Sequence, residues 1–250
     1  WSFEEDVLEY AQAGFEGIGV WRQKLSDMAE SKAMELLNHH GMTVSNLLWA
    51  GGFTGSDGCS FRESVCDAVE AIQQAARLKC KCVVLYTGSW RGHTKSHAHR
   101  LVANALEQIT PFAEEFGVDL AVEPMHPGCG GDWTFLECME EALTLIDPFE
   151  SPALKLALDT YHFGISSPDL SFLQDIAHRL AIVHLGDGTN LPQGEQDRCE
   201  LGRGVVPNKR IIQTLLDSGY DGFFDVELIG ESVECIDYPT LISDARNYVA

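Results

Sequence analysis

Residues 101–124 read LVANALEQITPFAEEFGVDLAVEP and contain one repeating unit of the fold. Apolar side chains recur at helical spacing up to Phe116, and Gly117 follows as a helix stop signal. Residues 118–122 then form a short apolar run without strict alternation, which is typical of a strand covered on both faces of a parallel sheet. Glu123 follows this run directly. The stretch therefore predicts a helix, a tight turn and a buried strand that ends in a carboxylate.

The same alternation extends to both sides of this unit. Short apolar runs predict seven strands, at residues 17–20, 42–48, 82–86, 118–123, 154–159, 180–185 and 222–228. Helical spacing predicts a helix after each strand and one before the first, beginning after Ser2 and then at about 26–40, 65–76, 101–116, 134–146, 169–177, 207–218 and 239–249. The pattern indicates an α/β protein with a parallel sheet.

Two closures of such a sheet compete, an open doubly wound sheet and a (β/α)8 TIM barrel. The chain has neither a GxGxxG sequence after an early strand nor a GxxxxGK[ST] sequence, which disfavours the nucleotide-binding open sheet. A chain that opens directly with a helix fits a barrel whose first strand lies before Trp1 or is missing from the sequence. No linker or low-complexity stretch divides the chain, so we expect residues 1–250 to form a single TIM-barrel domain.

Composition narrows the class of function. Hydrophobic residues make up 45% of the chain, which excludes disorder, and no apolar run reaches the ~20 residues that a membrane helix needs. The formal net charge of −21 disfavours binding to nucleic acid or to anionic membranes. The eight cysteines form no CxxC pair, so we expect reduced thiols and a cytoplasmic protein.

Ionisable residues stand where four of the predicted strands end. These residues are Glu123, Asp159, His184 and Glu227. In a barrel these positions meet at one rim, where three carboxylates without matching cations would repel one another. A divalent cation removes that repulsion. Three carboxylates and one imidazole form a mostly hard-oxygen site, which favours Mn²⁺ or Mg²⁺ and also suits Co²⁺ or Zn²⁺.

The ordered set of strand-end motifs resembles the xylose isomerase-like TIM-barrel superfamily, which includes sugar phosphate isomerases and epimerases, inosose dehydratases and the AP endonuclease 2-like family. The motifs are Glu123-Pro124, Asp159-Thr-Tyr-His162, His184-Leu-Gly-Asp187, Asp197-Arg198 followed by Gly202-Arg-Gly204, and Glu227. Position by position, the resemblance implies one divalent metal ion held by Glu123, Asp159, His184 and Glu227. It also implies that His162 and Arg198 contact the substrate.

Other residues near the predicted rim are candidates by position. Trp90, Arg91 and His93 follow the strand at 82–86 and could wall a pocket or form an ordinary surface loop. His126 follows Glu123 in the same loop and is a candidate substrate contact. Asp187 is a candidate either for a partner of the metal ligands or for a turn residue.

The expected function is that of a metal-dependent isomerase or epimerase that acts on a small sugar, keto-sugar or polyol. We expect no nucleic-acid or membrane partner, and a homo-oligomer is possible. In this chemistry a proton is removed next to a carbonyl, a metal stabilises the enediolate, and Glu123 and Glu227 serve as base and acid. A keto-inositol (inosose) dehydratase uses the same opening step and stays open as an alternative.

Two other classes are weighed against this expectation. Endonuclease IV-like enzymes hold three zinc ions and need further histidines, but the relevant strands end in Leu47-Leu48-Trp49 and Tyr86-Thr87-Gly88. The Asp-Arg-His triplet of that class reads Asp197-Arg198-Cys199 here, so cysteine replaces its histidine. A non-catalytic metal-binding barrel is the other alternative. The intact pair Glu123 and Glu227 speaks against it.

Overall fold

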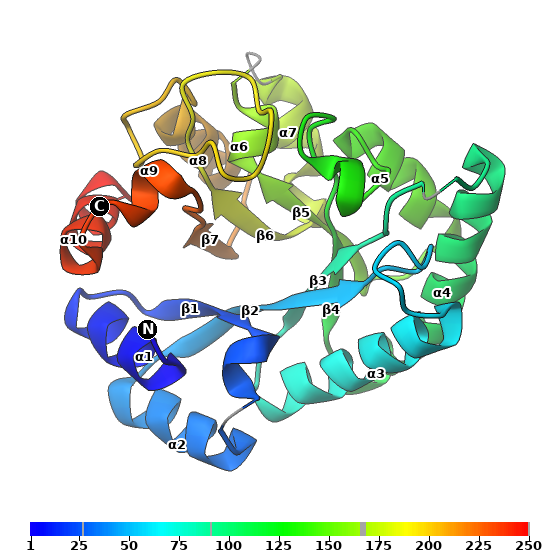
Figure 1. Ribbon diagram of the computed structural model, residues 1–250, viewed down its shortest axis with the longest axis horizontal. Helices are drawn as coiled ribbons and strands as arrows, with labels where there is room; N and C mark the ends of the chain where they lie inside the picture. Colours follow the sequence, from blue (N-terminus) through cyan, green and yellow to red (C-terminus); the bar gives the residue numbers. More distant parts are fainter. Residues whose placement is uncertain (27, 91, 166–168, 250) are drawn as a thin grey trace.

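The computed structural model describes residues 1–26, 28–90, 92–165 and 169–249. Seven parallel strands form one sheet in which each strand pairs with the next along the chain (Figure 1). The strands are β1 (Gly17–Trp21), β2 (Thr43–Gly51), β3 (Cys82–Tyr86), β4 (Asp119–Val122), β5 (Leu154–Asp159), β6 (Leu180–Leu185) and β7 (Phe223–Val226). The strands curve into a nearly closed barrel, which confirms the TIM-barrel prediction and rules out the open doubly wound sheet.

The helices lie around the outside of this barrel (Figure 1). The α-helices are α1 (Phe3–Gln12), α2 (Glu30–His40), α3 (Phe61–Arg77), α4 (Lys95–Phe116), α5 (Met139–Ile146), α6 (Thr160–Phe163), α7 (Leu170–Ile176), α8 (Asn208–Asp217), α9 (Glu231–Glu234) and α10 (Tyr238–Val249). Short 3-10 turns lie at Arg22–Leu25 (η1), Gly130–Asp132 (η2), Asp147–Phe149 (η3) and Ala177–Arg179 (η4).

Local sequence signals account for several helix ends. Ser2 and Glu5 form a reciprocal capping box at the start of α1, as their spacing predicts. Gly41 and Gly117 end α2 and α4 in the left-handed conformation, with φ of 67° and 66°, which glycine adopts without a Cβ penalty. These caps set where each helix stops and the next strand begins.

Side-chain packing brings the first and last described strands together. A Cβ built on Gly17 of β1 would lie 2.9 Å from the ring of Phe223 in β7. A Cβ on Gly19 would clash with the Asp225 carboxylate, which accepts hydrogen bonds from Ser45 Oγ (2.8 Å) and Asn46 Nδ2 (2.5 Å). Glycine on β1 therefore allows β7 side chains to fill the space between the two strands.

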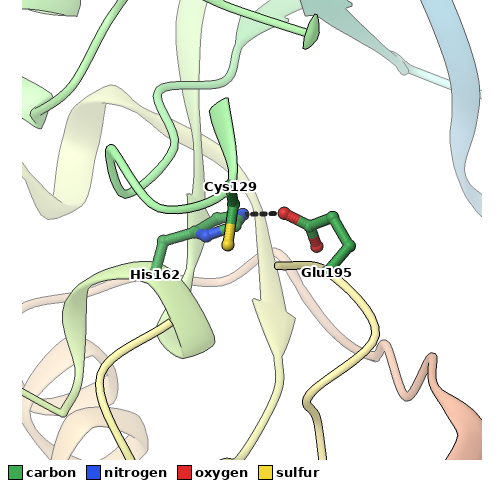
Figure 2. Close-up of side chains that lie close together, drawn as sticks. All are labelled: Cys129, His162 and Glu195. Atoms are coloured by element: carbon green, nitrogen blue, oxygen red, sulfur yellow. Dashed lines mark ion pairs between the residues drawn. The ribbon is translucent and has the colours of Figure 1, made fainter. Parts of the chain in front are cut away.

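The loops after β4 and β6 meet above the C-terminal ends of the strands. A Cβ on Gly128 would clash with the carbonyl oxygen of Pro192, so the two backbones approach closely only because residue 128 is glycine. Tyr161 Oη on α6 donates to the carbonyl oxygen of Gly194 at 2.7 Å and so links the second loop to α6. Figure 2 shows Cys129 and Glu195, one from each loop, facing each other.

Several predicted element boundaries are wrong. The helix expected from residue 134 begins at Met139, because Thr134 makes a bridge to Gly88 and residues 135–138 are irregular. The helix expected from residue 26 begins at Glu30, after η1. The short helices α6 and α9 were not predicted, since four residues are too few to show a helical period.

Buried aliphatic side chains from the strands and from the inward faces of the helices form the core. In the described ranges, the structure has no helix with the length and apolar composition to cross a membrane.

Candidate active site

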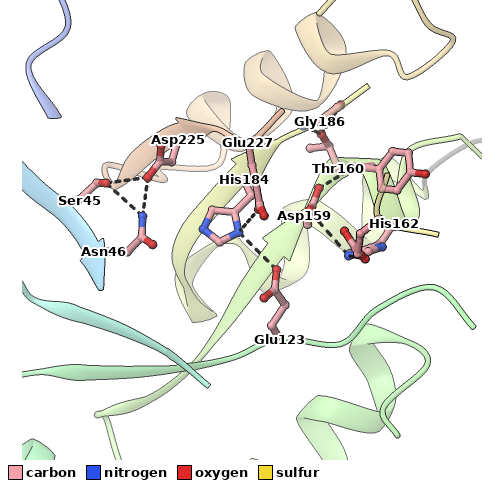
Figure 3. Close-up of polar contacts among 12 residues, drawn as sticks. Ser45, Asn46, Glu123, Asp159, Thr160, His162, His184, Gly186, Asp225 and Glu227 are labelled. Carbon is pink, nitrogen blue, oxygen red and sulfur yellow. Dashed lines mark hydrogen bonds and ion pairs between the residues drawn. The ribbon is translucent and has the colours of Figure 1, made fainter. Parts of the chain in front are cut away.

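Four ionisable side chains from neighbouring strands meet at the C-terminal rim of the barrel (Figure 3). Each offers a ligand atom, and these atoms lie within 4.8 Å of one another: Glu123, Asp159, His184 and Glu227. The first three are at most 2% exposed, and Glu227 is half-buried. Parallel strands place their C-terminal residues at one level, so the four residues selected from strand ends do lie together.

His184 lies between the two glutamates. Its Nδ1 is 3.3 Å from Glu123 Oε1 and 3.1 Å from Glu227 Oε2. Burial opposes a charged imidazole, but Glu227 and Glu123 outweigh burial and raise the pKa of His184 well above its ordinary value. The imidazole therefore acts as a counter-ion between the two carboxylates.

The two glutamates have different surroundings. Burial raises the pKa of Glu123, although His184 acts in the opposite direction. Burial also opposes ionisation of Glu227, but Arg198 and His184 outweigh it and lower the pKa of Glu227 to about 2. The difference comes from the guanidinium of Arg198, whose Nη2 lies 3.9 Å from Glu227 Oε1.

The donor set fits a divalent cation. Three carboxylates and one imidazole offer hard oxygen atoms and one nitrogen, the ligands of Mn²⁺, Mg²⁺ and Zn²⁺ sites. Asp159 Oδ2 is buried and has no hydrogen-bond partner, although Arg198 Nη1 lies 2.8 Å away. A cation would satisfy this oxygen and relieve the repulsion among the carboxylates.

Arg198 is 1% exposed and is enclosed by acidic side chains. Its Nη2 donates to Glu195 Oε2 at 2.6 Å, and its guanidinium lies 4.5 Å over the ring of Tyr161. Burial disfavours the charged form, but Asp159, Glu227 and Glu195 outweigh burial and raise the pKa of Arg198. Its structural role is therefore to neutralise the carboxylates around it.

His162 lies beside the same group, on α6. Its Nε2 is 3.7 Å from Asp159 Oδ2 and 3.4 Å from Glu195 Oε1, and neither ring nitrogen has a hydrogen-bond partner. Asp159 positions α6 by accepting the N–H of Tyr161 at 2.8 Å. The side chain is 1% exposed, so both nitrogens are buried polar atoms available to a ligand.

The remaining candidates lie farther out. His126 is half-buried in the loop after β4, where Nδ1 accepts from the N–H of Gly128 at 3.1 Å; burial and His162 lower the pKa of His126. Trp90 stacks on Phe135 with ring centroids 4.5 Å apart, so it packs against the protein's own aromatic side chain. Their roles as substrate contacts stay predictions.

The sequence also offered His93 and Arg91 as residues of the pocket wall. His93 hydrogen-bonds through Nε2 to the carbonyl oxygen of Thr54 at 3.1 Å. Arg91 lies outside the described residues.

Asp187 is a loop organiser. Its carboxylate is fully buried and accepts the backbone N–H groups of four residues at 2.8–3.2 Å: Gly188, Gly202, Gly204 and Val206. The sequence left two roles open for Asp187, a partner of the metal ligands and a turn residue. These backbone contacts are those of a turn residue.

Sequence reasoning missed two residues that the structure brings to the site. Glu195 pairs with Arg198 and faces His162, and Cys129 lies beside both. Both belong to irregular loops, where no periodicity marks them. The three-residue spacing from Glu195 to Arg198 was the only signal in the sequence.

The profile of the family described as "xylose isomerase-like TIM barrel" matches residues 7–249. The chain belongs to this family. Matching relatives include an inosose isomerase from Halalkalibacterium halodurans, 28% identical over 140 residues, 54% of this chain and 48% of that protein. A D-psicose 3-epimerase from Enterocloster bolteae is 32% identical over 124 residues, 49% of this chain and 37% of that protein.

A third relative is a probable endonuclease 4 from Mycoplasma mobile, 27% identical over 148 residues, 55% of this chain and 51% of that protein. The matched region thus spans about half or less of the length of these relatives. The relatives that this chain resembles are therefore named for more than one chemistry.

Solved structures extend the likeness over the whole chain. A Sinorhizobium meliloti 1021 protein superimposes with a TM-score of 0.88 at 23% identity, covering 99% of this chain and 92% of that one. The IolI protein, whose structure contains a zinc atom, superimposes with a TM-score of 0.84 at 19% identity, covering 100% and 92%. At these identities the likeness concerns the xylose isomerase-like fold.

Proposed function

We propose that the protein is a divalent-metal-dependent isomerase or epimerase of a small sugar, keto-sugar or related polyol. The observation that carries this proposal is the buried group of three carboxylates and one imidazole at the C-terminal rim of the barrel. The names of two relatives, an inosose isomerase and a D-psicose 3-epimerase, support the same class of reaction.

The residues that would hold the cation are Glu123, Asp159, His184 and Glu227. When bound, the cation supplies polarisation of adjacent carbonyl and hydroxyl oxygens, and we propose Mn²⁺ as the preferred ion. The chain itself supplies the proton transfer. Glu123 and Glu227 lie on either side of His184, so one can remove a proton next to the carbonyl while the other returns it.

Substrate positioning falls to the residues beside this group. His162 has two unpartnered ring nitrogens, which can donate to or accept from a substrate hydroxyl. Arg198 holds the substrate-facing carboxylates in place, and its Nε is buried without a partner. His126, in the loop after β4, is proposed as a substrate contact, and Trp90, after β3, as a wall of the substrate pocket.

The decisive experiment is substrate screening in D₂O. Ketoses, aldoses, hydroxypyruvate and keto-inositols are each incubated with the protein and saturating Mn²⁺. We expect deuterium on the carbon next to the carbonyl of the accepted substrate. Product structure then separates an isomerase or epimerase from a keto-inositol dehydratase, because only the dehydratase eliminates water.

The matched variants are Glu227→Gln and Glu231→Gln. Glu227→Gln keeps an oxygen ligand but removes the acid–base group, so turnover should fall by roughly 10²-fold or more at saturating Mn²⁺. Glu231 is exposed at the start of α9, so its variant should keep wild-type turnover. Full turnover by Glu227→Gln, activity that survives exhaustive chelation, or conversion without solvent deuterium would overturn the proposed mechanism.

A further inference from the structure

A second group of metal-ligand side chains lies next to the four-residue group. It consists of Cys129 from the loop after β4, His162 from α6 and Glu195 from the loop after β6 (Figure 2). A sulfur, a ring nitrogen and a carboxylate oxygen lie within 4.8 Å of one another. We call these three residues the thiol cluster.

The thiol cluster contains buried polar atoms that have no hydrogen-bond partner in the protein. His162 is 3% exposed, and neither of its ring nitrogens has a hydrogen-bond partner. Glu195 Oε1 is also buried without a hydrogen-bond partner and lies 3.4 Å from His162 Nε2. Leaving such atoms unpaired costs free energy, so their convergence points to a ligand that accepts electron pairs from both.

The surrounding structure holds two of the three side chains in position. Arg198 Nη2 donates a hydrogen bond to Glu195 Oε2 at 2.6 Å, which leaves Oε1 directed toward His162. Gly128 lets its loop reach the backbone of Pro192, and this approach places Cys129 opposite Glu195. Contacts outside the thiol cluster therefore set the positions of Glu195 and Cys129.

The donor set of the thiol cluster differs from that of the four-residue group. A thiolate and an imidazole favour a borderline-soft cation such as Zn²⁺ or Co²⁺, whereas three carboxylates favour harder ions. Three protein ligands also leave one tetrahedral position for water or another ligand.

We propose that Cys129, His162 and Glu195 bind a second divalent cation of the Zn²⁺ or Co²⁺ type. On binding, the Cys129 thiol releases its proton to solvent, and the sulfur, one ring nitrogen of His162 and Glu195 Oε1 each donate an electron pair to the ion, which leaves the other His162 nitrogen for a substrate hydroxyl. No oxidation or reduction is involved. Arg198 keeps its pairing with Glu195 Oε2 and with Asp159.

The test is titration of the chelator-treated full chain with Co²⁺, followed by absorbance and elemental analysis. We expect two ions per chain, and the second should give a thiolate-to-cobalt charge-transfer band. Cys129→Ala and Glu195→Gln should each take one ion, and the Cys129→Ala protein should lack the band. Cys138→Ala is the matched control, because Cys138 is also half-buried but precedes α5 outside the thiol cluster; it should keep two ions and the band.

The readouts do not depend on turnover. The single ion retained by Cys129→Ala also shows that this variant is folded and that the four-residue group is intact. A wild-type chain that takes one ion without a charge-transfer band would overturn the second site, as would a band that persists in Cys129→Ala. A chain that shows the band but no deuterium exchange would support the second site while contradicting the proposed function.

Discussion

Single buried charges determine how the upper rim of this barrel is held together. Arg198 faces three carboxylates, and Asp187 collects four backbone N–H groups from the long loop after β6. Each residue is at most 1% exposed. A buried charge is costly unless it is paired, so both residues are stabilising only together with these partners.

Removing the Asp187 carboxylate should therefore destabilise the protein. Asp187→Ala leaves four backbone N–H groups without their acceptor, and we expect a loss of roughly 2–4 kcal/mol in the free energy of unfolding. Urea unfolding measures the loss. The control is Asp217→Ala at the exposed end of α8, where a change within about 0.5 kcal/mol is expected. Equal stability of both variants would contradict the organising role of Asp187.

At the scale of elements, the contact between the loops after β4 and β6 depends on one missing side chain. Gly128→Ala places a Cβ against the carbonyl of Pro192, whereas a Cβ on Gly131 meets nothing within 4 Å. Gly128→Ala should lower the free energy of unfolding by about 1–3 kcal/mol through forced separation of the loops. Gly131→Ala should be close to neutral. Thermal unfolding of the two variants side by side gives the answer, and equal midpoints would contradict a tight loop contact.

The contact between α4 and the loop after β4 predicts a pH dependence. The ring of His99 on α4 lies 4.8 Å from that of Phe135, and burial lowers the pKa of His99. The folded state thus favours the neutral imidazole of His99. The protein therefore loses stability as the pH falls from the pKa of the unfolded state, about 6.5, through the lower pKa of the folded state. His99→Gln should lose less stability than wild type between pH 8 and pH 5. Parallel losses in urea unfolding at the two pH values would contradict the assignment.

The sequence predicts helices and strands that have a clear hydrophobic period. It does not predict contacts in irregular loops, where the chain has no such period. The unit from Leu101 to Glu123 folds as expected, because helical spacing, a glycine cap and an apolar strand all agree. The four strand-end residues were found for the same reason: a parallel barrel fixes their level. Cys129 and Glu195 were missed because loop contacts such as Gly128 against Pro192 depend on tertiary approach, which no local pattern records.

For the whole molecule, the formal charge of −21 makes two effects of added ions separable. Any salt screens the general repulsion among the acidic side chains, so stability should rise gradually with NaCl. A cation bound by the four-residue group acts differently, because binding to the folded state alone stabilises it by RT ln(1 + [M]/Kd). That contribution is about 2.7 kcal/mol when the free ion is at 100 times its Kd.

We therefore expect Mn²⁺ to raise the unfolding midpoint of the chelator-treated protein beyond what NaCl of equal ionic strength does. Glu123→Gln removes one negative ligand beside His184 while keeping the side-chain shape, so it should retain the NaCl effect and lose most of the Mn²⁺ effect. Thermal unfolding across a Mn²⁺ series measures both contributions. If Mn²⁺ and ionic-strength-matched NaCl shift the midpoint equally, the carboxylates at the rim are stabilised by screening and by Arg198 alone, and the four-residue group is not a metal site.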